Sequence, residues 1–225
     1  MEHRNFYGRI KGKSLKDSQR RYLDEDLPRL AVPGVERGGA RIDAEALAEG
    51  RALWLEIGFG SGEHLVHQAM ANPGALIVGA EPYMNGVASL LGKLRREGAA
   101  NVRVHAGDAR DLMDVLPDGC IDKAFLLYPD PWPKARHHRR RFVTPEHLGP
   151  LHRVMAQGAE LRVASDIGSY IHQALIECPR AGFEWRARRA ADWREPWDDW
   201  IRTRYEAKAV REGRTPCYLQ FERRG

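Results

Sequence analysis

The sequence predicts an α/β fold built on a mostly parallel, doubly wound sheet, and three observations support this. Short apolar runs with the length of buried strands occur at 52–57, 75–80, 102–106, 120–127 and 159–165. Segments of helical period, such as 84–98 and 145–158, separate them, as is typical of a parallel sheet with helices on both faces. A glycine-rich turn follows the first run, and an acidic residue lies at or just past the end of each run. In a doubly wound sheet those ends face one crevice, where ligands bind.

The length and the charge distribution predict one domain with a basic extension. The chain has 225 residues, with 36 Lys and Arg against 31 Asp and Glu, a formal net charge of +5. Much of the excess lies before residue 22 and after Lys134, which favours a polyanionic partner. We expect a basic, mobile arm over residues 1–30 and a single domain over residues 31–225. The arm either stays solvated or orders over a bound cofactor or phosphate backbone.

The composition disfavours membrane, secreted and metal-binding classes. No apolar run approaches membrane-spanning length and the N-terminus has no hydrophobic signal region, so we expect a soluble, cytoplasmic protein without membrane contact. Cys120, Cys178 and Cys217 are far apart and outside any C-x-x-C pattern, which predicts buried, reduced thiols. We expect no bound metal and no obligate protein partner.

The first strand ends in the glycine-rich run EIGFGSG, in which Gly58, Gly60 and Gly62 allow a tight turn and close approach of a ligand to the backbone. The dinucleotide pattern G-x-G-x-x-G would require glycine at position 63, and Glu63 at a helix start disfavours a pyrophosphate. The observed G-x-G-x-G spacing, with Glu56 two residues before it, instead suits S-adenosylmethionine, which carries a sulfonium and an ammonium but no phosphate.

Acidic residues mark the ends of five successive predicted strands: Glu56, Glu81, Asp108, Asp130 and Asp166. Carboxylates crowded into one crevice repel one another unless they meet hydroxyls, N–H donors or cations. Glu81 is placed for the ribose hydroxyls of the cofactor, and Asp108 for its adenine amino group. The row of acids therefore predicts a cationic, hydroxyl-bearing ligand at the carboxyl edge of the sheet.

The fourth strand runs into a stiff, proline-rich turn, YPDPWP at 128–133. Three prolines in five residues fix φ and remove backbone donors, so Asp130 and Trp132 are held in defined positions. Trp132 either stacks on a base or packs within the protein, and the sequence does not decide between these roles.

A basic run follows this turn directly and contains Lys134, Arg136, His137, His138, Arg139, Arg140 and Arg141. A rigid corner carrying an acid and an aromatic ring beside such a run indicates chemistry on a base within a nucleic acid. Near the end of the chain, 183–190 and 217–223 read as two late strands with a helix over 203–212 between them. Three tryptophans at 193, 197 and 200 recur at helical spacing, which predicts a packed helical face.

Three blocks of the sequence resemble the bacterial tRNA (guanine-N7)-methyltransferases of the TrmB type: 55–65, 128–142 and 203–213. The resemblance implies a Rossmann-like, class I S-adenosylmethionine-dependent methyltransferase fold with a late antiparallel strand. It also implies that Asp130 is catalytic and that the cofactor is contacted by Glu56, Gly58, Gly60, Gly62, Glu81, Asp108, Ala109 and Asp130. The implied substrate contacts are Lys134, Asp166, Thr203, Arg204, Tyr205 and Glu206. The implied RNA contacts are Arg136, His137, His138, Arg139, Arg140 and Arg141, and Ala135 departs from a frequently basic position.

The implied reaction is transfer of a methyl group to N7 of a guanine in the variable loop of tRNA, the m7G46 type. Guanine N7 carries a lone pair and no proton at neutral pH, so the enzyme mainly aligns the reactants and stabilises the positive charge arriving on the purine. Asp130, with Asp166 or Glu206, is expected to accept hydrogen bonds from the guanine N1–H and amino group. Thr203 opens a helix, where it either contacts an anion or simply caps the helix.

Two other functions fit parts of the sequence. Pro-Asp-Pro-Trp resembles the acid-proline-proline-aromatic corner of amino-group methyltransferases acting on adenine, but Trp132 stands where those enzymes have a second proline. A catalytically silent RNA-binding module on the same fold is the other alternative, and the intact set of crevice acids argues against it.

Overall fold

The computed structural model describes residues 8, 10, 12–35 and 39–225. Within these residues, seven strands form one sheet in the order β3-β2-β1-β4-β5-β7-β6. The strands are β1 (Ala52–Ile57), β2 (Ala75–Ala80), β3 (Val102–His105), β4 (Ile121–Leu127), β5 (Met155–Ser165), β6 (Phe183–Trp185) and β7 (Cys217–Arg223). β7 is antiparallel to both β5 and β6. The other four pairs, β3–β2, β2–β1, β1–β4 and β4–β5, are parallel. The predicted mostly parallel, doubly wound sheet with a late antiparallel strand is confirmed.

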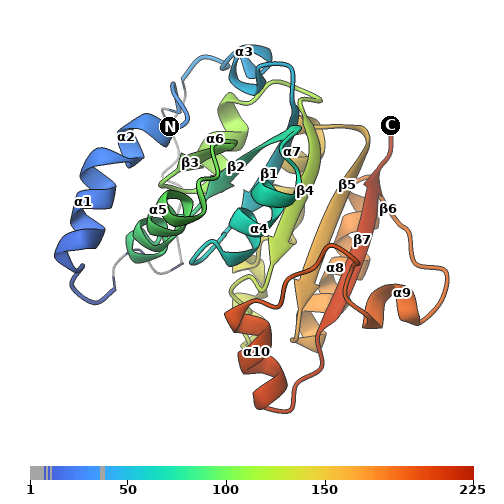
Figure 1. The fold of residues 1–225 in the computed structure, drawn as a ribbon. Coiled ribbons are helices and arrows are strands. Elements are labelled where there is room, and N and C mark those ends of the chain that lie inside the picture. Colours follow the sequence, from blue (N-terminus) through green and yellow to red (C-terminus); the bar gives the residue numbers. More distant parts are fainter. Residues whose placement is uncertain (1–7, 9, 11, 36–38) are drawn as a thin grey trace.

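Helices cover both faces of the sheet (Figure 1). One face packs against α4 (Glu63–Ala71) and α5 (Met84–Glu97), and the other against α6 (Ala109–Val115), α7 (Pro145–Val154) and α8 (Gly168–Arg180). Because side chains alternate along a strand, Leu55 and Ile57 of β1 face the α7 side and Glu56 between them faces α4. The remaining elements here are the short helices α3 (Ala44–Ala48) and α9 (Ala191–Arg194) and the helix α10 (Arg204–Arg211). Ala44 and Ala48 of α3 belong to the same core cluster as α6, α7 and α8.

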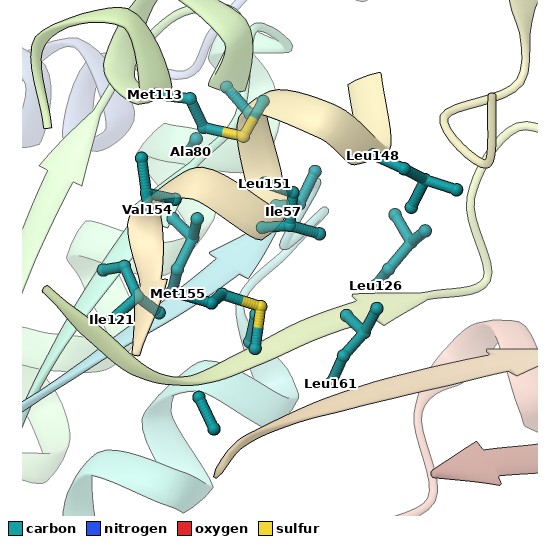
Figure 2. Close-up of a cluster of buried hydrophobic side chains, with 14 of the residues drawn as sticks. Ile57, Ala80, Met113, Ile121, Leu126, Leu148, Leu151, Val154, Met155 and Leu161 are labelled. Carbon is teal, nitrogen blue, oxygen red and sulfur yellow. The ribbon is translucent and has the colours of Figure 1, made fainter. Parts of the chain in front are cut away.

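The larger core cluster lies between the sheet and α6 and α7. Figure 2 shows Ile57, Leu126 and Leu161, from three adjacent strands, pointing toward Met113 of α6 and Leu151 of α7. Four of these five side chains are at most 2% exposed, and Ile57 at the rim is 6% exposed. This buried contact fixes the strand ends that carry the polar residues described below.

The N-terminal region contains structure that the sequence did not predict. Helices α1 (Asp17–Glu25) and α2 (Leu27–Leu30) fall within the stretch expected to be a mobile arm, and α1 packs against α5. Tyr22 lies against Gly92 of α5, and Arg95 of α5 pairs with Glu25 and Asp26. Tyr22 and Leu23 of α1, with Leu27 and Leu30 of α2, also pack against the core cluster that contains α4 and α5 residues. Residues 1–7, 9 and 11 of the expected arm lie outside the described residues.

Two other elements differ from the sequence prediction. The helix expected over 145–158 ends at Val154, because Met155 is fully buried and pairs with Ile121 at the start of β4. The strand expected over 183–190 ends at Trp185.

The predicted tryptophan face is packed but not helical. Only Trp193 lies in a helix, α9, because Pro196 prevents the helix from continuing. Trp197 and Trp200 lie in the following loop and pack edge-on against Tyr218, with ring centroids 5.5 and 5.6 Å from its ring.

The three cysteines are free thiols, as predicted, but Cys120 and Cys217 are only partly buried. Cys178 is fully buried, and burial raises the pKa of the Cys120 thiol to about 11. Among the described helices, none has the length and apolar character needed to cross a membrane.

The core assignment predicts a large cost for truncating Leu151. Leu151→Ala should lower the free energy of unfolding by about 2–5 kcal/mol, because buried methyl groups are removed and a cavity remains. Urea denaturation followed by circular dichroism measures this. Met70→Ala on α4, where the side chain is 53% exposed, is the control and should stay within about 0.5 kcal/mol of wild type. Equal losses of stability in the two variants would contradict the position of Leu151 in the core.

Candidate active site

A cleft of about 1060 Å³ lies at the carboxyl ends of β1, β2, β3 and β4. It brings together residues from seven separate segments of the chain. The sequence-predicted residues that line it are Gly58, Gly60, Glu81, Asp108, Ala109, Asp130, Arg139, Arg140, Arg204 and Tyr205. The parallel order of the sheet therefore places three of the expected acids around one space.

The three glycines of the turn after β1 have different roles. All three have positive φ, +71° at Gly58, +58° at Gly60 and +77° at Gly62. A Cβ at Gly58 would meet no atom within 4 Å, so the backbone there is open to the cleft. A Cβ at Gly62 would lie 2.5 Å from Cδ1 of Leu90, so this glycine allows α4 and α5 to pack closely. Gly58 can thus admit a ligand, whereas Gly62 serves packing.

Glu81 is fixed at the end of β2 by backbone donors. Its Oε2 accepts from the Gly60 N–H at 2.7 Å and its Oε1 from the Tyr83 N–H at 2.9 Å. Burial raises the pKa of this carboxyl, with a further contribution from the charge of Asp130, while the two N–H donors oppose the rise. Each oxygen keeps a lone pair, so Glu81 can still accept hydrogen bonds from ligand hydroxyls.

Asp108 caps α6 and is held ionised by Arg110. Its Oδ1 accepts from the Arg110 N–H at 2.9 Å and its Oδ2 from the Arg110 Nε at 2.9 Å. Partial burial alone would raise the pKa of Asp108, but the Arg110 hydrogen bonds and charge outweigh it and lower the pKa. Asp108 is therefore a well-oriented acceptor at the start of α6.

Asp130 lies in a turn whose backbone is strained. Tyr128 and Trp132, on either side of it, have φ of +48° and +41°, a region that residues other than glycine rarely adopt. Desolvation within the cleft raises the pKa of Asp130. Its carboxylate accepts no hydrogen bond from any residue that the structure describes, unlike those of Glu81 and Asp108. This acid is therefore the one positioned to meet a cationic or N–H-bearing ligand.

Trp132 packs against the basic segment that follows it in the chain. This segment forms a 3₁₀ helix, η1 (Ala135–Arg140). The Arg140 guanidinium lies 5.0 Å from the Trp132 ring centroid, and the His137 ring lies edge-on to it at 5.9 Å. Trp132 also lines the cleft, so it packs within the protein and still borders the cleft.

Arg141 was expected among the RNA contacts, and the structure instead places it inside the protein. It is fully buried, and its guanidinium donates to Pro131, Trp132, Ser169 and Gln173. The physical reason is that the carbonyl groups of the proline-rich turn need donors that prolines cannot supply. Lys134, Arg136 and Arg139 are exposed, as an RNA-binding segment requires.

The residues of α10 divide between the cleft and the interior. Tyr205 is 43% exposed and lies over the glycine turn, 3.1 Å from where a Cβ of Gly60 would be, with the Arg204 guanidinium 4.8 Å from its ring centroid. Thr203 caps the helix by accepting from the Glu206 N–H at 3.3 Å. The Glu206 side chain is buried and accepts from Trp200 Nε1 at 2.5 Å and Tyr218 Oη at 2.9 Å.

Several predicted site residues lie outside the cleft lining. Glu56 is 2% exposed and bonded to His64 Nδ1 at 2.7 Å, because position 56 of β1 faces α4. Asp166 lies one residue past β5 and pairs with Arg214. The others outside the lining are Gly62, Lys134, Arg136, His137, His138, Arg141, Thr203 and Glu206.

The cleft also contains residues that the sequence reasoning missed. Arg110, Tyr128, Phe142 and His147 line it. Arg110 could have been expected, since it lies two residues after Asp108 at a helix start. His147 of α7 and Phe142, which stacks on it with ring centroids 5.3 Å apart, had no signal in the sequence.

Known proteins match the sequence over most of its length. A family model described as "Putative methyltransferase" matches residues 50–219. The tRNA (guanine-N(7)-)-methyltransferase of Ruegeria pomeroyi is 67% identical over 224 residues, 98% of this chain and 94% of that protein. The chain belongs to the tRNA (guanine-N(7)-)-methyltransferase family. Proteins of the same name from Roseobacter denitrificans and Rhodospirillum rubrum are 65% and 46% identical, covering 98% and 99% of this chain and 97% and 89% of theirs.

Solved structures confirm the fold of this tRNA (guanine-N(7)-)-methyltransferase family member. The 16S rRNA methyltransferase KamB superimposes with a TM-score of 0.61 at 19% identity, covering 82% of this chain and 95% of that one. A variant of the 16S rRNA (adenine(1408)-N(1))-methyltransferase of Catenulisporales acidiphilia, solved with its cosubstrate SAM, gives 0.53 at 17% identity and covers 86% and 96%. At these identities the likeness shows the fold, which is the predicted class I methyltransferase fold.

Because Gly58 and Gly62 have different surroundings, alanine at the two positions should affect ligand binding and stability differently. Binding is tested with S-adenosylhomocysteine as the ligand. Gly58→Ala should weaken binding, because its methyl group enters the open space of the cleft. Its free energy of unfolding should fall only by the backbone strain, about 1 kcal/mol. Gly62→Ala adds a clash with Leu90 and should cost a further 1–3 kcal/mol or so. Calorimetric titration and urea denaturation measure the two effects, and a larger reduction of binding in Gly62→Ala would contradict the assignment.

Proposed function

We propose that this tRNA (guanine-N(7)-)-methyltransferase family member transfers a methyl group from S-adenosylmethionine to N7 of a guanine in the variable loop of tRNA. The observation that carries the proposal is the cleft at the carboxyl edge of the sheet, where Glu81, Asp108 and Asp130 meet beside an exposed basic segment. Since tRNA is the substrate, we propose a cytoplasmic location.

The cleft suits a cationic cofactor with hydroxyl and amino donors. Gly58 leaves the backbone open, Glu81 keeps acceptor lone pairs for a ribose diol, and Asp108 is an oriented acceptor for an adenine amino group. S-adenosylmethionine supplies an electrophilic methyl group on a positively charged sulfonium. Glu56 directly precedes the glycine turn in the chain, but it is buried and bonded to His64 outside the cleft lining.

Asp130 is the residue we assign to the guanine. The N1–H and amino group of guanine form a pair of donors that one carboxylate can accept, and adenine offers no such pair on that edge. The Asp130 carboxylate has no partner among the described residues, so it can accept this pair and compensate the positive charge that arrives on the purine. Both oxygens of Glu206 accept hydrogen bonds, from Trp200 and Tyr218. Among the described residues Asp166 is bonded only to Arg214 and only through Oδ2, which favours Asp166 as the second acid.

The basic segment after the turn suits the phosphate backbone. Lys134, Arg136 and Arg139 are exposed, and Arg139 also borders the cleft, so phosphate contacts there would bring a base close to Asp130. Trp132, which contacts Arg140 and His137 and lines the cleft, can form one wall for that base.

Asp130→Asn tests the proposed function most directly. At saturating tRNA and methyl donor its kcat should fall by about 100-fold or more, because the charge facing the purine is removed. Its stability should match wild type, since Asp130 has no partner within the described residues. Labelled methyl transfer to unmodified tRNA, followed by nucleoside mapping, measures the rate and the methylated atom.

The exposed Asp24→Asn on α1 is the matched control and should be fully active. A tRNA with adenine at the variable-loop position should accept no methyl group. Wild-type methylation of an adenine amino group would support the amino-group alternative, and binding of tRNA without any transfer would support the silent module. An Asp130→Asn rate within a few fold of wild type would remove Asp130 from the chemistry.

The basic segment should determine the salt dependence of tRNA binding. The double variant Arg136→Ala/Arg139→Ala should bind more weakly, with the slope of log Kd against log salt reduced by about 0.7–0.9 for each phosphate that is no longer neutralised. Arg180→Ala, at the end of α8 where the side chain is 71% exposed, is the control. Filter binding at several salt concentrations measures both, and an unchanged slope in the double variant would exclude the segment from the interface.

A further inference from the structure

Arg141 forms a buried polar link between two parts of the site. Its Nε donates to the Pro131 carbonyl at 2.8 Å, its Nη1 to the Ser169 carbonyl at 2.9 Å and to Gln173 Oε1 at 3.0 Å, and its Nη2 to Ser169 Oγ at 2.9 Å. Nη2 also lies 3.5 Å from the Trp132 carbonyl. All of these acceptors are neutral oxygens, and the side chain is fully buried. Burial of this kind indicates that Arg141 has a structural role, because a phosphate could not reach its guanidinium.

One side of the link is the turn that carries Asp130. The turn is bracketed by the positive φ angles of Tyr128 and Trp132, which persist only where the surroundings impose them. The two carbonyls that Arg141 contacts, those of Pro131 and Trp132, directly follow Asp130 in the chain. The guanidinium therefore restrains the strained turn at the point where it leaves Asp130.

The other side of the link is the start of α8. This helix begins at Gly168, two residues after Asp166, and Ser169 lies in its first turn. Gln173 also donates to the Val143 carbonyl at 2.9 Å, which closes the connection between α8 and the segment following Arg141. Arg141 thus joins the segment bearing Asp130 to the segment bearing Asp166.

We propose that Arg141 is a positioning residue that fixes the Asp130 turn relative to the start of α8, and so sets the separation of the two acids. This inference rests on the proposed role of Asp130 in the reaction. Arg141 touches neither RNA nor cofactor, and it acts through the turn. A planar guanidinium presents five N–H donors in a fixed fork, which a lysine ammonium cannot reproduce across both segments.

The test compares Arg141→Lys and Arg141→Gln with Leu151→Ala. Both Arg141 variants should lower kcat by about 10- to 100-fold, the effect of a reacting group displaced by about 1 Å. Their Kd for tRNA and its salt slope should equal those of wild type, because the same phosphates remain neutralised. Leu151→Ala, studied at a temperature where it is folded, should lose stability and keep its kcat, which separates positioning from stability.

If the Arg141 variants do not fold, two milder substitutions on α8 provide the test. Ser169→Ala removes one acceptor and should lower kcat, whereas His172→Ala, an exposed neighbour on the same helix, should not. The proposal is overturned by a wild-type kcat in Arg141→Gln or, if that variant is unfolded, in Ser169→Ala. A salt slope in Arg141→Gln reduced by the value of about one phosphate would also overturn it, since that marks an RNA contact. Inactivity of the wild-type protein on tRNA would instead refute the proposed function itself.

Discussion

The parallel pairing of β1 with β4 is the constraint on which the cleft depends. Ile57 pairs with Leu126 at the ends of these strands, so the glycine turn and the proline turn leave the sheet side by side. Their side chains also share the core cluster with α7, so sliding one strand past the other would bury polar groups and expose apolar ones. The chemistry of the site is thus fixed by the same contacts that stabilise the fold.

Three carboxylates can lie in the same cleft because each is stabilised by different surroundings. Backbone N–H groups hold Glu81, the guanidinium of Arg110 holds Asp108, and Asp130 is left without a partner among the described residues. The pKa shifts follow this pattern, raised at Glu81 and Asp130 by burial and lowered at Asp108 by Arg110. A site arranged in this way favours a positively charged ligand, because such a ligand relieves the repulsion that remains.

Strand positions and the acids at strand ends could be predicted from sequence, because apolar runs and strand–helix alternation are local patterns. The direction of a side chain could not. Glu56 lies in the correct strand but faces α4, and Glu206 turns inward to Trp200 and Tyr218. Arg141 looked like part of a charged run, yet the unmet carbonyls of the neighbouring turn draw it inside. Helices α1 and α2 escaped prediction because they pack on elements distant in the chain, α1 on α5 and α2 on β3.

The positions of the two ends of the described chain relative to the cleft decide where a fused tag is tolerated. Gly8 lines the cleft, and farther along Lys13 accepts a hydrogen bond from Asn85 at the start of α5. β7 runs away from the cleft, from Cys217 beside Ser165 to Glu222 beside Glu160, and the C-terminus lies at the opposite end of the sheet from α10 (Figure 1). A purification tag joined to the C-terminal end is therefore remote from the cleft, whereas Gly8, near the other end of the described chain, is itself part of the lining.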